Sequence, residues 1–213
     1  GDWEAEGGLN EWHVASGRKV PVVYGWTEPF ACAGHAVAIC QDRAREKAHF
    51  MSCGVPVAPH AVITTAAELA AINPDLLPGI LKTARMGYDG KGQVRVRTPL
   101  ELSAAWERLG SVPCVLEQLL PLAAELSVIV VRGADGSIVN FPVQQNLHRD
   151  GILAVTEVPA SGVDAALQQQ AVASARQVAE AMGYVGVLCI EFFLLQDGRL
   201  VVNEMAPRPH NSG

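Results

Sequence analysis

Residues 187–205 read Val187-Leu-Cys-Ile-Glu191-Phe-Phe-Leu-Leu-Gln196-Asp197-Gly198-Arg199-Leu-Val-Val-Asn-Glu204-Met205. Two runs rich in β-branched and aromatic residues flank Asp197-Gly198, a pattern that predicts a β-hairpin with a two-residue turn. That turn would place Glu191 directly opposite Glu204, with both side chains on one face and their Cβ atoms about 4.5–5.5 Å apart.

Two carboxylates in this position repel each other, and the flanking residues are apolar. A raised pKa on one carboxyl would relieve the repulsion, and so would a divalent cation bound between the two. Mg²⁺ suits such a site because it commonly takes one or two carboxylates together with substrate phosphates. The alternative is a pair of solvated charges at a sheet edge. A register shift of one residue would place the two carboxylates on opposite faces of the hairpin.

A second feature is the basic stretch from Lys82 to Arg97, which also contains Gly87, Gly90 and Gly92. Glycines let the backbone approach an anion and direct N–H groups toward it, so the stretch is a candidate phosphate site. It is neither a P-loop nor a dinucleotide fingerprint, because a predicted strand follows where those motifs need a helix. The alternative is an ordinary hairpin whose arginines are solvated.

The rest of the chain mixes predicted helices and strands. Capping-box sequences begin at Thr65 and Thr98, and Asp164 begins a long helix that ends at Met182. That helix carries one apolar stripe, which we interpret as core: Leu167, Ala171, Ala175, Val178 and Met182. Several strands are expected in hairpins, so the pattern favours an α+β fold.

Composition excludes several classes of protein. The 213 residues are 49% hydrophobic, which excludes dominant disorder, and the net charge of −6 argues against nucleic acid as a partner. No apolar run reaches the roughly 18 residues of a membrane span, and the acidic start does not resemble a signal peptide. The five cysteines show no Cys-x-x-Cys spacing, which favours free thiols in a reducing cytoplasm.

Five sequence features together resemble the ATP-grasp superfamily. They are Lys82, Met86-Gly-Tyr-Asp-Gly-Lys-Gly-Gln93, Glu117, Glu125 and Asn203-Glu-Met-Ala-Pro-Arg-Pro-His-Asn-Ser-Gly213. Within it, residues 34–213 resemble the 5-(carboxyamino)imidazole ribonucleotide synthase family. The resemblance implies two α+β subdomains that clamp ATP, truncated at both ends. Residues 1–33 would be an unmatched leader or remnant, 34–117 the N-terminal subdomain with the glycine loop, and 118–213 the C-terminal subdomain with the metal-binding hairpin.

The resemblance also implies roles for individual residues. Mg²⁺, or alternatively Mn²⁺, would be held by Glu191 and Glu204. Asp89, Lys91 and Arg208 would be catalytic. Substrate would contact Tyr88, Asp89, Lys91, Arg208, His210 and Asn211. ATP would contact Arg43, Lys82, Gly87, Tyr88, Asp89, Gly90, Lys91, Gly92, Gln93, Glu117, Gln118, Leu119, Leu120, Glu125, His148, Asn203 and Glu204.

The activity implied is that of an ATP-dependent carbon–nitrogen ligase of purine biosynthesis. It would carboxylate aminoimidazole ribonucleotide with bicarbonate through carboxyphosphate, in the cytoplasm, as a homodimer when full length and without nucleic acid or membrane. Residues 1–33 lack the glycine turn of the family's first domain, and Ala206 stands where many ATP-grasp enzymes have Asn. Two alternatives remain: another ATP-grasp ligase, such as formate-dependent glycinamide ribonucleotide transformylase, or a non-catalytic nucleotide-binding fragment.

Overall fold

The computed structural model describes residues 10–13, 19–22, 31–85, 92–149, 152–208, 210 and 212. The chain forms two compact units, Gly1–Ala31 and Cys32–Gly213. In the first unit, β1 (Asn10–His13) pairs with β2 (Lys19–Val22) as an antiparallel hairpin. All candidate site residues belong to the second unit.

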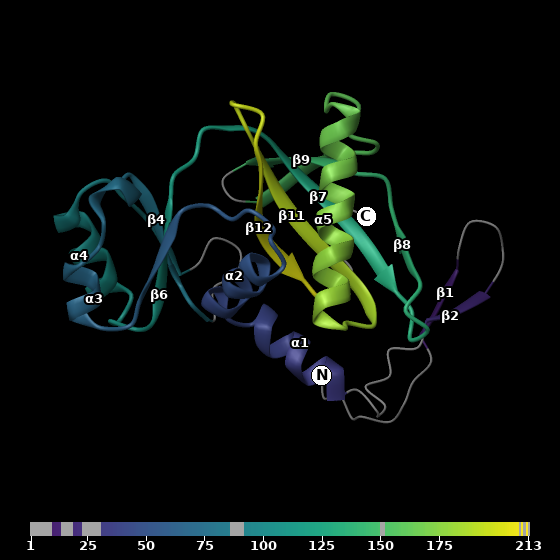
Figure 1. Cartoon of the computed structure of the whole chain (residues 1–213), viewed down its shortest axis with the longest axis horizontal. Helices are drawn as coiled ribbons and strands as arrows, with labels where there is room; N and C mark the ends of the chain where they lie inside the picture. Colours follow the sequence, from purple (N-terminus) through teal and green to yellow (C-terminus); the bar gives the residue numbers. More distant parts are fainter. Residues whose placement is uncertain are drawn as a thin grey trace. The chain divides into compact units, whose positions relative to one another are not determined.

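One part of the second unit is a four-stranded antiparallel sheet with the order β3-β6-β4-β5. Helices α3 and α4 lie side by side against it, and their apolar residues pack into one core with Leu81 and Leu116 of the sheet (Figure 1). Thr65 and Glu68 form the predicted capping box at α3. The bounds are β3 His60–Ile63, α3 Ala66–Ala70, a 3₁₀ turn Pro74–Leu76, β4 Gly79–Thr83, β5 Gln93–Val96, α4 Pro99–Arg108 and β6 Cys114–Gln118.

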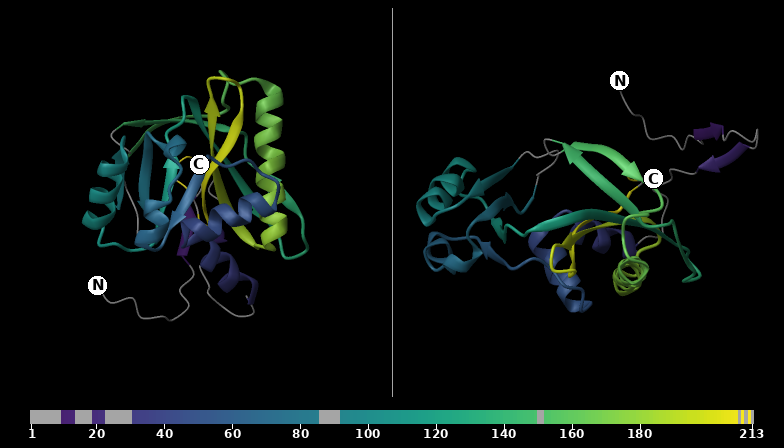
Figure 2. Two further views of the ribbon diagram at one scale, coloured as in Figure 1. Left: turned by 60° about the vertical axis from the view of Figure 1, so that its left-hand side comes forward. Right: turned by 90° about the horizontal axis from the view of Figure 1, so that it is seen from above.

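The other part is a six-stranded antiparallel sheet with the order β10-β9-β7-β11-β12, and β8 pairs with β7 off this path. The long helix α5 lies across one face of it (Figures 1 and 2). The predicted stripe is confirmed, because Ala171, Ala175, Val178 and Met182 are buried in this core. The bounds are β7 Leu122–Arg132, β8 Ile138–Asn140, β9 Gln144–Arg149, β10 Ile152–Glu157, α5 Ala165–Met182, β11 Gly186–Leu195 and β12 Leu200–Ala206.

Helices α1 (Ala31–Cys40) and α2 (Arg43–Ser52) precede the four-stranded sheet in the chain but pack elsewhere. Ala36, Ile39 and Phe50 belong to the core of the six-stranded sheet. The predicted segment 34–117 therefore does not pack on one sheet, and residue 118 marks only where the chain leaves the four-stranded sheet. The expected α+β class is confirmed. No helix in the described ranges is long and apolar enough to cross a membrane.

The β11–β12 hairpin differs from the predicted register. Leu195 donates its backbone N–H to Arg199 O at 2.8 Å, so the turn holds Gln196, Asp197 and Gly198 rather than two residues. Gly198 has a φ of +83°, which favours glycine. The predicted two-residue turn is therefore wrong.

A β-bulge then shifts the register further along the same hairpin. Phe192 pairs with Val202, but Ile190 pairs with Met205, so Asn203 and Glu204 together lie opposite Glu191. The predicted direct pairing of Glu191 with Glu204 is wrong for this reason.

The bulge nevertheless keeps both carboxylates on one face. Val202 and Met205 both lie in the core, although residues three apart on a regular strand point to opposite faces. Asn203 and Glu204 therefore both face away from the core. Glu191 does so too, because its neighbours Ile190 and Phe192 are core residues.

Candidate functional site

The face of the six-stranded sheet opposite α5 is polar in its centre. Leu126 and Val128 of β7 point into the core, so Glu125 and Ser127 point to the other face. Cross-strand pairing aligns Ser127 with Glu191 on one side and with Gln144 on the other. We call this set the polar face: Glu125, Ser127, Gln144, Asn146, His148, Glu191, Asn203 and Glu204.

Two carboxylates of the polar face each have a histidine partner. His148 Nδ1 lies 2.7 Å from Glu125 Oε2, and His210 Nε2 lies 2.9 Å from Glu191 Oε1. Burial, together with the charge of Glu191, raises the pKa of Glu125 despite the opposing effect of His148. The predicted ribose contact and the predicted metal ligand are thus electrostatic neighbours.

Glu204 has a cationic partner on α2. Asp42 caps this helix by accepting from the N–H groups of Ala44 and Arg45, which places Arg43 in the first turn. Arg43 Nη1 donates to Glu204 Oε2 at 2.9 Å. One turn later, Glu46 Oε1 accepts from the backbone N–H of Met205 at 2.7 Å. Helix α2 therefore holds the bulge of β12 at two points.

Glu117 lies between two lysines in a buried group that we call the lysine cluster: Lys47, Lys82 and Glu117. Lys82 Nζ is 3.2 Å from Glu117 Oε1 and Lys47 Nζ is 3.3 Å from Glu117 Oε2. Burial alone would raise the pKa of Glu117, but Lys82 and Lys47 outweigh it and lower that pKa. Burial lowers the pKa of Lys47, which Glu117 only partly offsets. The cluster holds more positive than negative charge, which suits a site for an anion.

Sequence reasoning missed Glu46 and Lys47, which are 3% and 1% exposed. Their spacing carried a signal, because Arg43, Glu46, Lys47 and Phe50 occupy one face of a helix. Phe50 is fully buried, so the charged residues beside it face inward as well.

Other predicted residues are placed as follows. Gly92 and Gln93 lead into β5, where Gln93 pairs with Lys82. The Gln118 and Leu119 N–H groups donate to the Pro59 and Pro78 carbonyls. Arg208 is exposed at the end of β12. The predicted residues Gly87, Tyr88, Asp89, Gly90, Lys91 and Asn211 lie outside the described residues.

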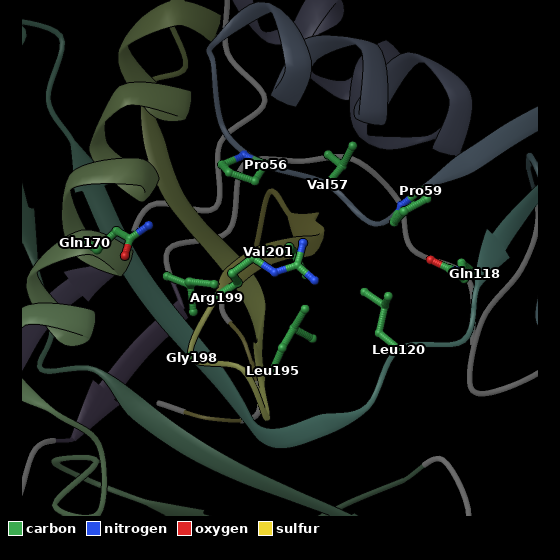
Figure 3. A pocket seen from close by; sticks show the side chains of 11 residues that line it. Pro56, Val57, Pro59, Gln118, Leu120, Gln170, Leu195, Gly198, Arg199 and Val201 are labelled. Atoms are coloured by element: carbon green, nitrogen blue, oxygen red, sulfur yellow. The ribbon is translucent and has the colours of Figure 1, made fainter. Parts of the chain in front are cut away.

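A pocket of about 390 Å³ lies beside the segment that leaves β6 (Figure 3). Gln118 and Leu120 line it, together with the segment around Pro56 and the turn at Arg199. None of the ion-paired residues Arg43, Lys82, Glu117, Glu191 and Glu204 lines this pocket. It is therefore a feature separate from the charged groups of the site.

The oxygen donors near the bulge fit a hard cation. Glu191, Asn203 and Glu204 supply carboxylate and amide oxygens, which Mg²⁺ prefers. Asn203 Oδ1 is buried and accepts no hydrogen bond, so it is available as a further oxygen ligand. The described ranges contain no group of three His, Cys, Asp or Glu side chains placed to hold a metal alone. A cation here would need oxygens from Asn203, a bound phosphate or water to complete its shell.

Comparison with known proteins gives a family match. The model of the ATP-grasp domain matches residues 48–213. N5-carboxyaminoimidazole ribonucleotide synthase of Bacillus subtilis is 44% identical over 176 residues, covering 82% of this chain and 46% of the relative. The chain spans about half the length of the curated relatives that it matches.

Solved structures agree with this result. The ADP complex of an N5-carboxyaminoimidazole ribonucleotide synthetase superposes with a TM-score of 0.78 at 38% identity, covering 84% of this chain and 48% of that one. The Aspergillus clavatus N5-carboxyaminoimidazole synthase, solved with ADP and 5-aminoimidazole ribonucleotide, gives 0.73 at 32% identity, with 84% and 47% coverage.

Proposed function

The chain belongs to the ATP-grasp domain family, and from that membership we propose that its polar face and its lysine cluster bind ATP together with Mg²⁺. The observation that carries the proposal is the bulge of β12. It turns Asn203 and Glu204 to the face that holds Glu191, and Arg43 contacts the carboxylate of Glu204. This arrangement supports the proposal, because oxygen atoms suited to a cation share one face of the sheet and a guanidinium suited to phosphate contacts one of them.

We assign the described residues by their chemistry. Lys82 and Arg43 would bind phosphate oxygens, because ammonium and guanidinium groups form charge-assisted hydrogen bonds with phosphate. Glu125 would accept hydrogen bonds from the ribose hydroxyls, and the backbone of residues 117–120 would contact the adenine edge. Glu191 and Glu204, with Asn203, would hold Mg²⁺. The cation, when bound, neutralises charge on the phosphoryl group during transfer.

The reaction proposed for the whole protein is the ATP-dependent carboxylation of aminoimidazole ribonucleotide. The phosphoryl group of ATP passes to bicarbonate, and the substrate amine then attacks the carbon of carboxyphosphate and releases phosphate. Arg208 and His210 would bind the bicarbonate region, while Asp89 and Lys91 would act from the glycine loop on the substrate amine. We propose a cytoplasmic homodimer, and the free thiols of Cys40, Cys53, Cys114 and Cys189 suit that reducing compartment.

Nucleotide binding and turnover need separate tests. Calorimetry should show that the chain binds ADP more tightly with Mg²⁺ than with EDTA. Glu191→Gln and Glu204→Gln should each weaken this Mg²⁺-dependent binding by about tenfold, whereas the exposed helix residue Glu180→Gln should not change it. If both variants bind Mg-ADP as the parent does, the metal site is wrong.

ADP release separates the enzyme proposal from its alternatives. Stimulation by aminoimidazole ribonucleotide and bicarbonate supports the carboxylase, and stimulation by formate and glycinamide ribonucleotide supports the other ligase. Binding of ATP without ADP release under either condition would identify a non-catalytic nucleotide-binding chain.

A further inference from the structure

A chain of buried polar side chains runs across the polar face to His210. Asn146 Nδ2 donates to Ser127 Oγ at 2.9 Å, Ser127 Oγ lies 2.9 Å from Ser212 Oγ, and Ser212 Oγ lies 2.9 Å from His210 Nδ1. His210 Nε2 then meets Glu191 Oε1 at 2.9 Å. Ser127, Asn146 and Ser212 are 0%, 6% and 3% exposed, so water does not compete for these bonds.

The direction of these hydrogen bonds follows from the groups at the two ends of the series, His210 and Asn146. The backbone N–H of Ser212 donates to His210 Nδ1 at 3.3 Å, which requires Nδ1 to be an acceptor. The neutral ring then carries its proton on Nε2 and donates it to Glu191. Asn146 Nδ2 can only donate, so Ser127 accepts there and has its own proton left to give.

One competing arrangement exists at Ser127. Its hydroxyl could instead donate to Gln144 Oε1, but that oxygen is farther away, at 3.2 Å. If Ser127 donated there, Ser212 would have to donate to Ser127 and could no longer donate to His210 Nδ1. The neighbouring Cys189 offers Ser212 only a sulfur atom, which is a weak acceptor. The Ser127-to-Ser212 direction is therefore favoured.

We propose that Ser127 and Ser212 are positioning residues that fix the Nε2–H tautomer and the orientation of His210 against Glu191. The two serines come from strand β7 and from the chain end after β12, 85 positions apart, and meet only in the fold. The tautomer assignment stands on the hydrogen bonds alone. Its consequence for nucleotide binding rests on the proposed function, because Glu191 is a proposed ligand of Mg²⁺.

Nitrogen NMR of the histidine rings tests the tautomer directly, with His210→Gln used to assign the signal. Under conditions in which the ring is neutral, the parent should show protonated Nε2 and unprotonated Nδ1. Ser127→Ala and Ser212→Ala should each raise the share of protonated Nδ1 without making it the main form, because the hydroxyl bond to Nδ1 is weakened or lost while the Ser212 backbone N–H and Glu191 still favour protonated Nε2. Ser127→Thr, which keeps the hydroxyl, should restore the parental signal. Val128→Ala is the matched control, because it removes buried volume from the same strand on the core face.

The inference is overturned if the parent shows protonated Nδ1, or if both serine-to-alanine variants keep the parental signal. A second readout is Mg-ADP affinity, which Ser212→Ala should lower by about tenfold and Val128→Ala should leave unchanged. Equal affinity of Ser212→Ala and the parent would overturn the link to Glu191. If the parent itself does not bind Mg-ADP, the proposed function fails, and the ring signals still decide the tautomer.

Discussion

Arg43 Nη1 donates to Glu204 Oε2 at 2.9 Å, joining the first turn of α2 to the bulge of β12 across 161 positions of sequence. Burial lowers the pKa of Arg43, but the charge of Glu204 and its hydrogen bond outweigh burial and raise it, so the guanidinium stays charged. A phosphate bound beside this pair would accept a hydrogen bond from Arg43, and a bound cation would be coordinated by the carboxylate of Glu204.

Arg43→Met should therefore lower the affinity for Mg-ADP by about ten- to a hundredfold, since a hydrogen bond to a charged group contributes about 1.5–3 kcal/mol. Arg43→Lys should lie between this variant and the parent, because it keeps the charge but loses the planar fork. Calorimetry provides the measurement. Arg45→Met, on the exposed side of the same helix, is the control. Equal affinities of Arg43→Met and Arg45→Met for Mg-ADP would show that Arg43 does not contribute to nucleotide binding.

Lys47→Met should destabilise the protein by about 3 kcal/mol, because it removes one of the two cations that neutralise the buried Glu117. The loss in the double variant Lys47→Met/Glu117→Gln should be smaller than the sum of the two single losses, because both substitutions break the same ion pair, whereas Lys82 loses its partner only through Glu117→Gln. Urea unfolding measures both values. Additive losses in the double variant would show that Lys47 and Glu117 do not interact.

Glu46→Gln tests the pH dependence of stability. Burial and the charge of Glu204 raise the pKa of Glu46 from 4.5 to about 8. Between these values the folded protein holds a proton that the unfolded chain has lost, so the free energy of unfolding falls as pH rises. Glutamine cannot titrate, and its amide oxygen can still accept from Met205 N–H.

The variant should therefore gain stability relative to the parent as the pH rises from 5 to 8. Urea unfolding at several pH values gives the comparison, with Glu180→Gln as an exposed control. Parallel pH curves for Glu46→Gln and the parent would show that burial does not perturb Glu46.

The hairpin shows what sequence could and could not predict. Alternation around Asp197-Gly198 correctly indicated β11, β12 and a shared face for Glu191 and Glu204. It missed the three-residue turn and the bulge, two register changes that compensate for each other: Ile190 still pairs with Met205, as a two-residue turn would require. The position of a bulge depends on which side chains pack into the core, here Val202 and Met205. The sequence of a single strand does not show which of its residues will do so.

Long-range partners were the other limit. The residue types at Lys82, Glu117 and Glu125 marked a site, but the meeting of Lys47 with Glu117, or of Ser127 with Ser212, depends on how separate elements pack. Arg95 and Arg97 of the basic stretch are exposed, as the hairpin alternative expects, while Lys82 is buried in the lysine cluster. Local pattern thus predicted the elements, and tertiary packing decided which charges interact.

Gly79→Ala should destabilise the protein by about 1–3 kcal/mol, the usual cost of overpacking. A Cβ at this position would lie 2.6 Å from Leu76 O and 2.8 Å from Glu117 O, both of them backbone atoms. Relief of this contact would shift β6 at Glu117 and disturb its pairs with Lys82 and Lys47, so Mg-ADP affinity should fall together with stability. Thermal unfolding and calorimetry measure the two effects.

Gly34→Ala is the control for this substitution. A Cβ there meets no atom within 4 Å, and alanine favours a helix over glycine, so stability should stay constant or rise. If Gly79→Ala lowers stability but leaves Mg-ADP affinity unchanged, β6 does not transmit strain to the lysine cluster. If it lowers neither, the close approach of Gly79 to the two carbonyls is not a constraint on this fold.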